Sequence, residues 1–252
     1  MKILLNTTKI MDLDTPPPAG VRGTRPRQRA EAEQLMQRLR LLDVGDLQSL
    51  MDLSLELADR TRADIARWGD RGRPARPAFS AFTGLVYKHL DPRTLPPGAW
   101  DDAQRRVRII SGLYGLLRPR DLVEAYRLEM GCGVAPPDAP NLVAFWRPRV
   151  TAALNADLRR GEPVINLASA EYLAAVDRAA LKGPVIWPVF QQRRADGKRK
   201  VVAVHAKQAR GAMVRYALET GAVEPADLAG FDVGGWQAQG PPPAAGEWVF
   251  AR

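Results

Sequence analysis

The residues best suited to chemistry gather in segment 108–131, where an apolar run leads into a glycine turn and then a dense group of charges. Gly112 and Gly115 allow a tight turn whose backbone N–H groups can face an anion. Arg118 and Arg127 follow, and guanidinium groups suit a phosphate. A glycine turn between helices would form a helix-hairpin-helix, in which backbone amides approach a phosphate. An ordinary helix connection uses the same glycines, so the segment alone leaves both interpretations open.

Four side chains could take part in catalysis. Lys9 directly follows the first apolar run, where it could bind phosphate or act as a nucleophile. Glu129 and Glu171 could serve as general acid and base, and Tyr87 could present its hydroxyl to the same site. Lys9 and Tyr87 each have an ordinary alternative, because a lysine after a strand is often solvated and a tyrosine often belongs to the core.

Further polar residues are placed where a ligand could reach them. Asn166 and Ser169 lie at the end of an expected buried strand, and strand ends in mixed α/β folds are where sites tend to lie. If segment 207–217 is helical, Lys207 and Arg210 share one face, and that basic strip can approach a phosphate closely.

The charge balance is strongly basic. The 252 residues include 37 Lys and Arg against 28 Asp and Glu, which gives a net charge of +9. Such a field attracts phosphates at long range, so a polyanionic partner is plausible. The frequent arginine, alanine and proline also fit a general bias in residue choice, so charge alone does not establish nucleic-acid binding.

Several kinds of site are disfavoured by composition. Cys132 is the only cysteine, and His89 and His205 are the only histidines. An internal disulfide and a Cys-rich metal cluster are therefore excluded, and a His-based metal site or a Ser/His/Asp hydrolase is disfavoured. We expect no metal and no cofactor.

No segment has the character of a membrane span. The N-terminal apolar run covers only residues 3–5, and no later run is long enough. We therefore expect no membrane partner and a cytoplasmic location, while the sequence does not indicate an oligomeric state.

Hydrophobic periodicity predicts one mixed α/β (α+β) domain over residues 1–252, without internal repeats. Strands are predicted at 1–5, 163–169, 185–191, 201–205 and 248–250, with the third and fourth joined as a hairpin around Asp196 and Gly197. Helices are predicted at 30–42, from Asp46 as N-cap through 57 and onward to 68, at 100–108, and after the cap Asn141 to 158. For segment 207–217, which Gly211 interrupts, the helical conformation stays a condition. In segment 81–87, aromatic and β-branched residues around Gly84 predict either a strand or a tight turn that enters a helix.

These segments together resemble the YaaA family of bacterial peroxide-stress proteins. The resemblance is specific in SGLYGLLRPRDL (111–122), YRLEMG (126–131), INLASAEY (165–172) and KQARGAMVR (207–215). Weaker agreement in AFTGLVY, LVAFW and GEWVF extends it over nearly the whole chain.

The resemblance implies a single mixed α/β domain with a helix-hairpin-helix element and a basic cleft. It also implies a role in limiting free iron and DNA damage during peroxide stress, binding to double-stranded DNA, and no cofactor. The matching residues expected to line the cleft are Lys9, Tyr87, Ser111, Gly112, Tyr114, Gly115, Arg118, Tyr126, Arg127, Glu129, Asn166, Ser169, Glu171, Lys207 and Arg210.

Two departures from the family pattern indicate a diverged member. The usual Ser-Pro-Ala-Lys is here the segment NTTK at 6–9, which keeps only the lysine. The usual Gly-Asp-Val-Tyr is GLVY at 84–87, so Leu85 replaces an acidic residue beside the expected site.

Three hypotheses follow from these observations. The first is a DNA-binding, stress-protective protein that contacts phosphates through backbone amides and arginines. The second is an enzyme acting on a phosphorylated or nucleoside-like small molecule through Lys9, Glu129 and Glu171. The third is that the polar residues form a buried structural network, because Arg–Glu pairs can fix one packing without chemistry.

Overall fold

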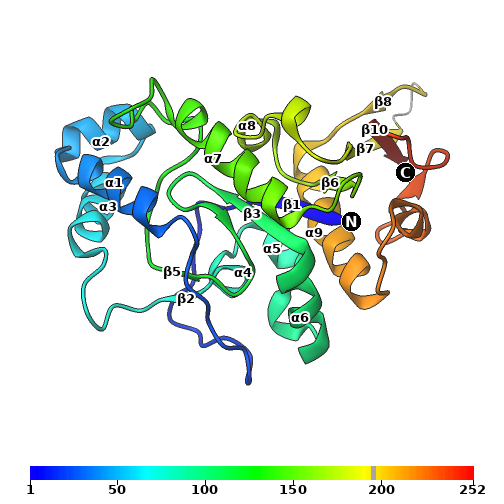
Figure 1. The fold of residues 1–252 in the computed structure, drawn as a ribbon, viewed down its shortest axis with the longest axis horizontal. Coiled ribbons are helices and arrows are strands. Elements are labelled where there is room, and N and C mark those ends of the chain that lie inside the picture. The colour runs from blue at the N-terminus through cyan, green and yellow to red at the C-terminus, as the bar shows by residue number, and fades with distance from the viewer. Residues whose placement is uncertain (194–196) are drawn as a thin grey trace.

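The protein is built around a mixed sheet whose middle strands run parallel. The computed structural model describes residues 1–193 and 197–252 (Figure 1). In the described chain, eight strands form this sheet in the order β4-β3-β1-β6-β7-β10-β9, with β8 paired to β7 outside that path. The strands are β1 (Lys2–Asn6), β3 (Val107–Ser111), β4 (Gly115–Leu117), β6 (Val164–Asn166), β7 (Val185–Arg193), β8 (Arg199–Lys200), β9 (Gln237–Ala238) and β10 (Gly246–Ala251); a separate small sheet pairs β2 (Arg76–Pro77) with β5 (Leu122–Val123).

Strand β1 is the centre of the sheet. Ile3 is in register with Val107 of β3 on one side and with Ile165 of β6 on the other, and both pairings are parallel. All three of these residues are almost fully buried. A continuous apolar run is what a parallel strand covered on both faces requires, because an alternating pattern would place polar side chains in the core.

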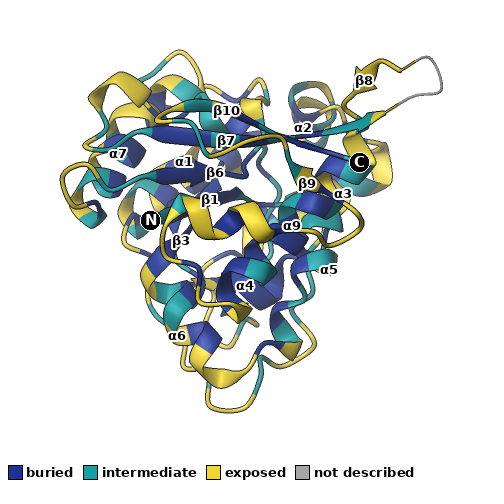
Figure 2. Cartoon of the chain, turned by 90° about the vertical axis from the view of Figure 1, so that its right-hand side faces the viewer, coloured by how far each residue is buried: buried dark blue, intermediate teal, exposed yellow. Residues whose placement is uncertain are grey.

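Helices cover both faces of the sheet. Helix α7 packs against β4, whereas α9 packs against β7, α5 and α6. The two views place α7 and α9 on opposite sides, with the buried strands between them (Figures 1 and 2). The helices are α1 (Arg29–Arg40), α2 (Val44–Met51), α3 (Leu55–Arg67), α4 (Ala78–Ala81), α5 (Leu85–Leu90), α6 (Pro97–Arg106), α7 (Leu142–Asp157), α8 (Ala170–Leu173) and α9 (Ala203–Glu219), and the 3-10 turns are η1 (Pro92–Thr94), η2 (Arg178–Ala180) and η3 (Pro225–Gly230). In the described ranges no helix combines the length and apolar character that crossing a membrane would need.

The direction of winding reverses at β1. The next parallel strand along the chain, β3, lies on one side of β1, while β6, β7 and β10 follow in order on the other side. Loops that leave a sheet on either side of such a reversal diverge, and they leave a crevice outside the carboxyl ends of the strands. The topology therefore directs attention to the ends of β1 and β6.

Much of the predicted architecture is confirmed. The mixed α/β class is correct, and the strands predicted at 1–5, 163–169 and 248–250 correspond to β1, β6 and β10. The helices predicted at 30–42 and after Asn141 correspond to α1 and α7, and the Asn141 side chain caps α7 by accepting from the Ala144 N–H at 2.8 Å. For segment 81–87 the second alternative holds, because the chain turns at Gly84 into α5.

The single helix predicted from Asp46 to residue 68 is wrong. Asp43 is the N-cap of α2, and Asp46 instead completes a capping box with it. The chain leaves the helix at Asp52, which has a φ of 52°, and Ser54 then caps α3 by accepting from the Leu57 N–H. An apolar repeat continues through this break, so periodicity alone could not detect it.

The glycine turn does not form a helix-hairpin-helix. It joins two antiparallel strands, β3 and β4, with Ser111 in register with Gly115. The Ser111 hydroxyl oxygen closes the turn by accepting from the N–H groups of Leu113 and Tyr114, at 3.2 and 3.0 Å. Gly115 has a φ of 67°, which favours glycine. Pairing of β3 with β1 in the core decides the strand conformation before the turn.

The strand predicted at 201–205 is also wrong. Helix α9 begins at Ala203, and only the two residues of β8 pair with β7. Buried Ala206, Ala209 and Met213 lie at helical spacing, so packing beneath the sheet outweighs the strand preference of the valines before them. Segment 207–217 lies within α9, so the condition that it is helical is met. The predicted turn at Asp196 falls on residues outside the described ranges.

We predict that Gly211→Ala destabilises the protein by about 1–3 kcal/mol, the usual cost of overpacking a core. A Cβ atom at this position would lie 1.9 Å from the carbonyl oxygen of Val86, so α9 and α5 would have to separate. Urea denaturation gives the free energy of unfolding. Gly98→Ala in α6 is the matched control, because a Cβ there meets no atom within 4 Å, and it should be neutral or slightly stabilising. Equal stability of the two variants would contradict the close packing of α5 on α9.

Candidate functional site

Polar side chains from distant segments meet where β1, β3 and β6 end. The Asn6 side chain links two of these ends, because its Oδ1 accepts from the Ser169 N–H at 2.9 Å. The Thr7 N–H donates to the Ile110 carbonyl at 3.1 Å, which ties the segment after β1 to β3. These bonds lie where the direction of winding reverses at β1. They hold segments 6–9 and 166–172 together at the carboxyl edge of the sheet, which is the edge at which β1, β3 and β6 end.

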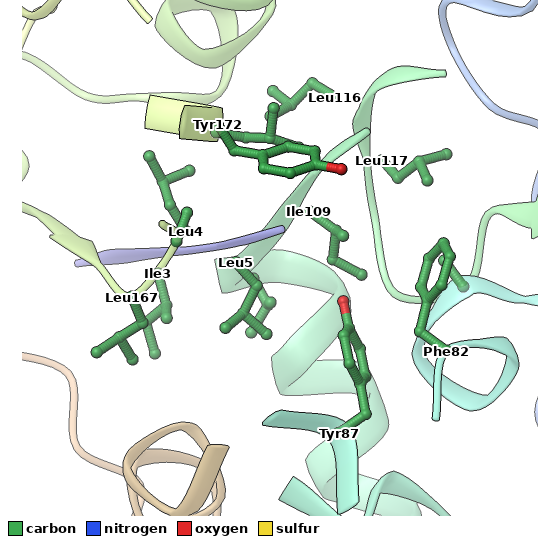
Figure 3. Close-up of a cluster of buried hydrophobic side chains, with 14 of the residues drawn as sticks. Ile3, Leu4, Leu5, Phe82, Tyr87, Ile109, Leu116, Leu117, Leu167 and Tyr172 are labelled. Carbon is green, nitrogen blue, oxygen red and sulfur yellow. The ribbon is translucent and has the colours of Figure 1, made fainter. Parts of the chain in front are cut away.

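A group of hydroxyls, which we call the hydroxyl cluster, lies at this edge and consists of Thr7, Tyr87, Ser111, Tyr126 and Tyr172. The Tyr126 and Ser111 hydroxyl oxygens are 2.7 Å apart, and the Thr7 hydroxyl donates to Tyr172 at 3.5 Å. The Tyr87 hydroxyl donates to the carbonyl of the last β1 residue at 3.2 Å. Tyr172 reaches past the end of β1 from α8 and Tyr87 reaches the same region from α5 (Figure 3).

The tyrosines of the hydroxyl cluster are held in their neutral form. Burial raises the pKa of Tyr172 to about 12, and it raises the pKa of Tyr87 and of Tyr126 well above the ordinary value. At neutral pH these groups therefore act as hydrogen-bond donors and acceptors, and none supplies a phenolate.

The predicted acid–base residues also meet at this edge. Lys9 Nζ lies 2.9 Å from Glu129 Oε2, in an ion pair that is partly open to solvent. Glu171 Oε1 accepts from the Gly131 N–H at 2.8 Å. The structure thus brings Lys9, Glu129 and Glu171 around segment 129–131, although 120 residues separate Lys9 from Glu129 in the sequence.

Gly112 serves close packing. A Cβ atom on Gly112 would lie 2.3 Å from the Leu128 carbonyl oxygen, so glycine lets segment 128–131 lie directly on the turn. Its own carbonyl accepts from the Trp146 Nε1–H at 2.7 Å. Gly115 packs equally closely against Gln28 and Trp146. The turn is therefore enclosed by protein atoms.

Of three other predicted residues, Arg118 and Tyr114 are held by hydrogen bonds to protein groups, whereas within the described part of the chain Arg127 is not. Arg118 donates to Asp121, whose carboxylate is completely buried, at 2.7 Å. The Tyr114 hydroxyl accepts from Trp68 Nε1 at 3.0 Å and from the Glu124 N–H at 3.2 Å. Arg127 is partly buried, and its Nε has no hydrogen-bond partner in the described residues. The first two arrangements match the structural-network hypothesis.

The two departures from the family pattern lie side by side. The Thr8 hydroxyl oxygen accepts from the Gly84 N–H at 3.2 Å, so the segment after β1 contacts the residue that precedes Leu85. A Cβ at Gly84 would come within 2.6 Å of the Thr8 side chain. The changes at Thr8 and Leu85 therefore affect one location near Lys9.

A cavity of about 1110 Å³ opens beside the same edge. It forms because β6 pairs with β7 only as far as Ile186, while β7 continues beside β10 to Gln191. Residues 187–190 consequently have no strand beside them where β6 would continue, and they line the cavity. Pro188 fits there, because a proline without an N–H is tolerated where a strand lacks a neighbour.

Charged side chains from three helical segments surround this cavity. Arg210 of α9 lines it, and burial lowers the pKa of its guanidinium. Arg147 of α7 and Arg178 of η2 also line it and are exposed, with Arg178 Cζ 5.2 Å from the centroid of the Trp187 ring. Within the described residues none of these three arginines forms an ion pair. Asn166 lines the cavity, whereas Lys207 is exposed on α9 outside its lining.

Sequence reasoning identified Asn166 and Arg210 but missed Arg147, Arg178 and Trp187. Arg147 lies on an exposed helix face, which carries no sequence signal for a site. Trp187 is the informative case, because the alternation within β7 leaves it half-buried where a central parallel strand would bury it.

Cys132 lies beside the acidic residues of the edge. Burial raises the pKa of its thiol, and the charges of Glu129 and Glu171 raise it further. In the described part of the chain, no group of three or more His, Cys, Asp or Glu residues is arranged to hold a metal ion.

Comparison with known proteins shows which family and which individual proteins this chain is similar to. A family model described as peroxide stress protein YaaA matches residues 1–240. A UPF0246 protein of Paracidovorax citrulli is 42% identical over 256 residues, covering 100% of this chain and 98% of the relative. A UPF0246 protein of Flavobacterium johnsoniae is 40% identical over 254 residues and covers 100% of both chains. A third, from Laribacter hongkongensis, is 41% identical and covers 94% of this chain and 93% of the relative.

We predict that Cys132 reacts slowly with hydrogen peroxide and iodoacetamide in the folded protein at neutral pH. A raised pKa keeps the thiol protonated where an ordinary cysteine begins to ionise, and each unit lowers the thiolate fraction about tenfold. Mass spectrometry of the alkylated protein over time gives the rate. The protein in denaturant is the control and should react at the rate of a free thiol. A folded rate equal to or above the denatured rate would contradict the burial of this thiol.

Proposed function

Because this chain belongs to the YaaA peroxide-stress family, we propose that it binds double-stranded DNA and protects it during peroxide stress. The contact is made by basic side chains at the carboxyl edge of the sheet, chiefly Arg147, Arg178 and Lys207. Phosphates of a duplex are the partner that best fits exposed guanidinium and ammonium groups on a chain with a net charge of +9.

The observation that carries this proposal is the difference between two sets of basic residues. The two buried arginines of α6 and β3 are paired with carboxylates, Arg106 with Asp102 and Arg108 with Asp157. At the edge, Arg147, Arg178 and Lys207 are exposed and form no ion pair within the described ranges. An unpaired surface cation can neutralise a DNA phosphate and so release a counterion condensed on the DNA, whereas a cation held by a carboxylate is already neutralised.

The charge distribution also disfavours DNA binding at helices α2 and α3. Helices α2 and α3, joined through residues 52–54, have the general shape of a helical hairpin. Segment 41–59, which contains most of this pair, has five Asp and Glu and no Lys or Arg. Those carboxylates repel phosphates, so we place the DNA contact at the edge of the sheet.

We predict that affinity for a short fluorescent duplex falls steeply between about 50 and 200 mM salt. Combining Arg147→Gln, Arg178→Gln and Lys207→Gln should weaken binding and lower the slope of log affinity against log salt by about 0.9 for each phosphate that the variant no longer neutralises. Fluorescence anisotropy measures both.

The matched control combines Arg60→Gln, Arg67→Gln and Arg71→Gln, which removes the same charge from exposed residues of α3 and the loop after it. It should retain the parent slope. An equal decrease in both triple variants would show that only net charge matters, and absence of binding to the parent protein would exclude the proposal.

A second candidate function is an enzyme acting on a phosphorylated or nucleoside-like small molecule. The 2.9 Å pair of Lys9 with Glu129 favours it, because a lysine beside a carboxylate at a strand end can attack a carbonyl while the carboxylate moves a proton. Glu171 lies next to the same segment through its bond to Gly131.

We predict that borohydride reduction with a panel of phosphorylated carbonyl compounds traps an adduct on Lys9 if this second function holds. Peptide mass spectrometry locates the adduct. Lys9→Arg keeps a cation for Glu129 but cannot form a Schiff base, so it should abolish trapping. Labelling of exposed Lys88 to the same extent as Lys9 would indicate nonspecific reaction and count against the enzyme.

A further inference from the structure

We propose that the cavity between β6 and β7 is a binding site for a mononucleotide-sized ligand that joins an anionic group to a planar ring. Arg147 and Arg178 line this cavity and also belong to the proposed DNA contact, but the key residues of the site, Arg210 and Trp187, do not belong to that contact. The site is separate from the Lys9–Glu129 pair, which does not line the cavity.

The shape of the cavity follows from the unequal lengths of β6 and β7. After Asn166 the chain turns into α8, whereas β7 runs on past Ile186 with β10 as its partner. The space left open measures about 1110 Å³. Small-molecule sites are typically roughly 300–1,000 Å³, so the cavity accommodates a nucleotide with some water.

Arg210 supplies the reason for an anionic group. Arg210 is half-buried in the cavity lining, burial lowers the pKa of its guanidinium, and within the described residues it has no carboxylate or hydrogen-bond partner. A desolvated cation without a partner is costly, and the energetic penalty is removed when an anion binds beside it. Its position one turn after Ala206, which also lines the cavity, places it on the helix face directed at this space.

Trp187 supplies the reason for a planar ring. It is half-buried on β7, it lines the cavity, and the Arg178 guanidinium lies over its ring with 5.2 Å between Cζ and the ring centroid. An indole face and a flat guanidinium are the groups on which bases stack, and stacking tolerates any base.

Asn166 adds a neutral polar group. Its Nδ2 donates to the Ala168 carbonyl at 3.4 Å, which is a long bond and leaves the amide able to donate to a ligand. Two carboxylates, Asp177 and Glu247, also line the cavity against the three guanidinium groups, so the lining keeps one net positive charge. Asp177 is already engaged as an acceptor from the Ala179 N–H at 3.1 Å.

The test is to titrate the full chain separately with adenosine 5′-monophosphate, adenosine and inorganic phosphate. Calorimetry and tryptophan fluorescence measure the binding in each titration. Adenosine monophosphate should bind saturably and quench fluorescence, with adenosine and phosphate each at least about tenfold weaker. Phosphate binding equal to that of the nucleotide would overturn the planar-ring part, and no saturable nucleotide binding would overturn the proposal.

Two variants separate the groups that hold the ligand. Arg210→Gln should lower nucleotide affinity at least about tenfold without lowering the melting temperature, because it removes a cation that lacks a partner. Trp187→Leu should lower nucleotide affinity but leave phosphate affinity unchanged. Arg67→Gln is the control for removal of one charge. Unchanged nucleotide affinity in Arg210→Gln would overturn the assignment, and if that variant is unfolded, Trp187→Leu decides by the same criterion.

The duplex assay distinguishes this proposal from DNA binding. Nucleotide binding without duplex binding supports the cavity and removes the DNA function. Duplex binding without nucleotide binding supports the DNA function and overturns the cavity proposal.

Discussion

The parallel pairing of β1 with both β3 and β6 is the constraint on which the rest of the structure depends. It requires an apolar run that is buried on both faces, and it brings the residues after three distant strands to one edge. The bonds from Asn6 to Ser169 and from Thr7 to Ile110 then fix those segments against each other. The hydroxyl cluster, the Lys9–Glu129 pair and the neighbouring cavity all exist because these strand ends coincide.

Charge in this protein is divided between structure and surface. A buried guanidinium is tolerated when a carboxylate compensates it, as Asp102 does for Arg106 and Asp157 does for Arg108. Within the described residues Arg210 has no such carboxylate, so the desolvation cost of its guanidinium is not offset until an anion binds beside it. A high arginine content therefore does not describe a uniformly basic surface, and the acidic segment 41–59 makes the distribution uneven.

Close backbone approach and unequal strand length determine the shape of the edge. Gly112 lets the segment carrying Glu129 lie on the β3–β4 turn, and Gly131 leaves room for the Glu171 carboxylate. The early end of β6 leaves residues 187–190 of β7 with β10 on one side and no strand on the other, and this opens the cavity at Trp187. The chain belongs to a family of peroxide-stress proteins, and its site is understood from its own geometry because a fold alone does not specify chemistry.

The sequence by itself determined the class of fold, the principal strands and helices, and the family, because apolar runs, capping residues such as Asn141 and the matched motifs are local properties. It also identified Lys9, Glu129, Glu171 and Arg210 as residues of interest. Tertiary structure decided what local patterns could not: the glycine turn became a strand hairpin because β3 pairs with β1, and residues 203–205 became helix because α9 packs beneath β7. It also decided pairs such as Arg108 with Asp157, because these residues lie in segments far apart in the chain. It revealed the cavity as well, because a gap beside β7 depends on where another strand stops.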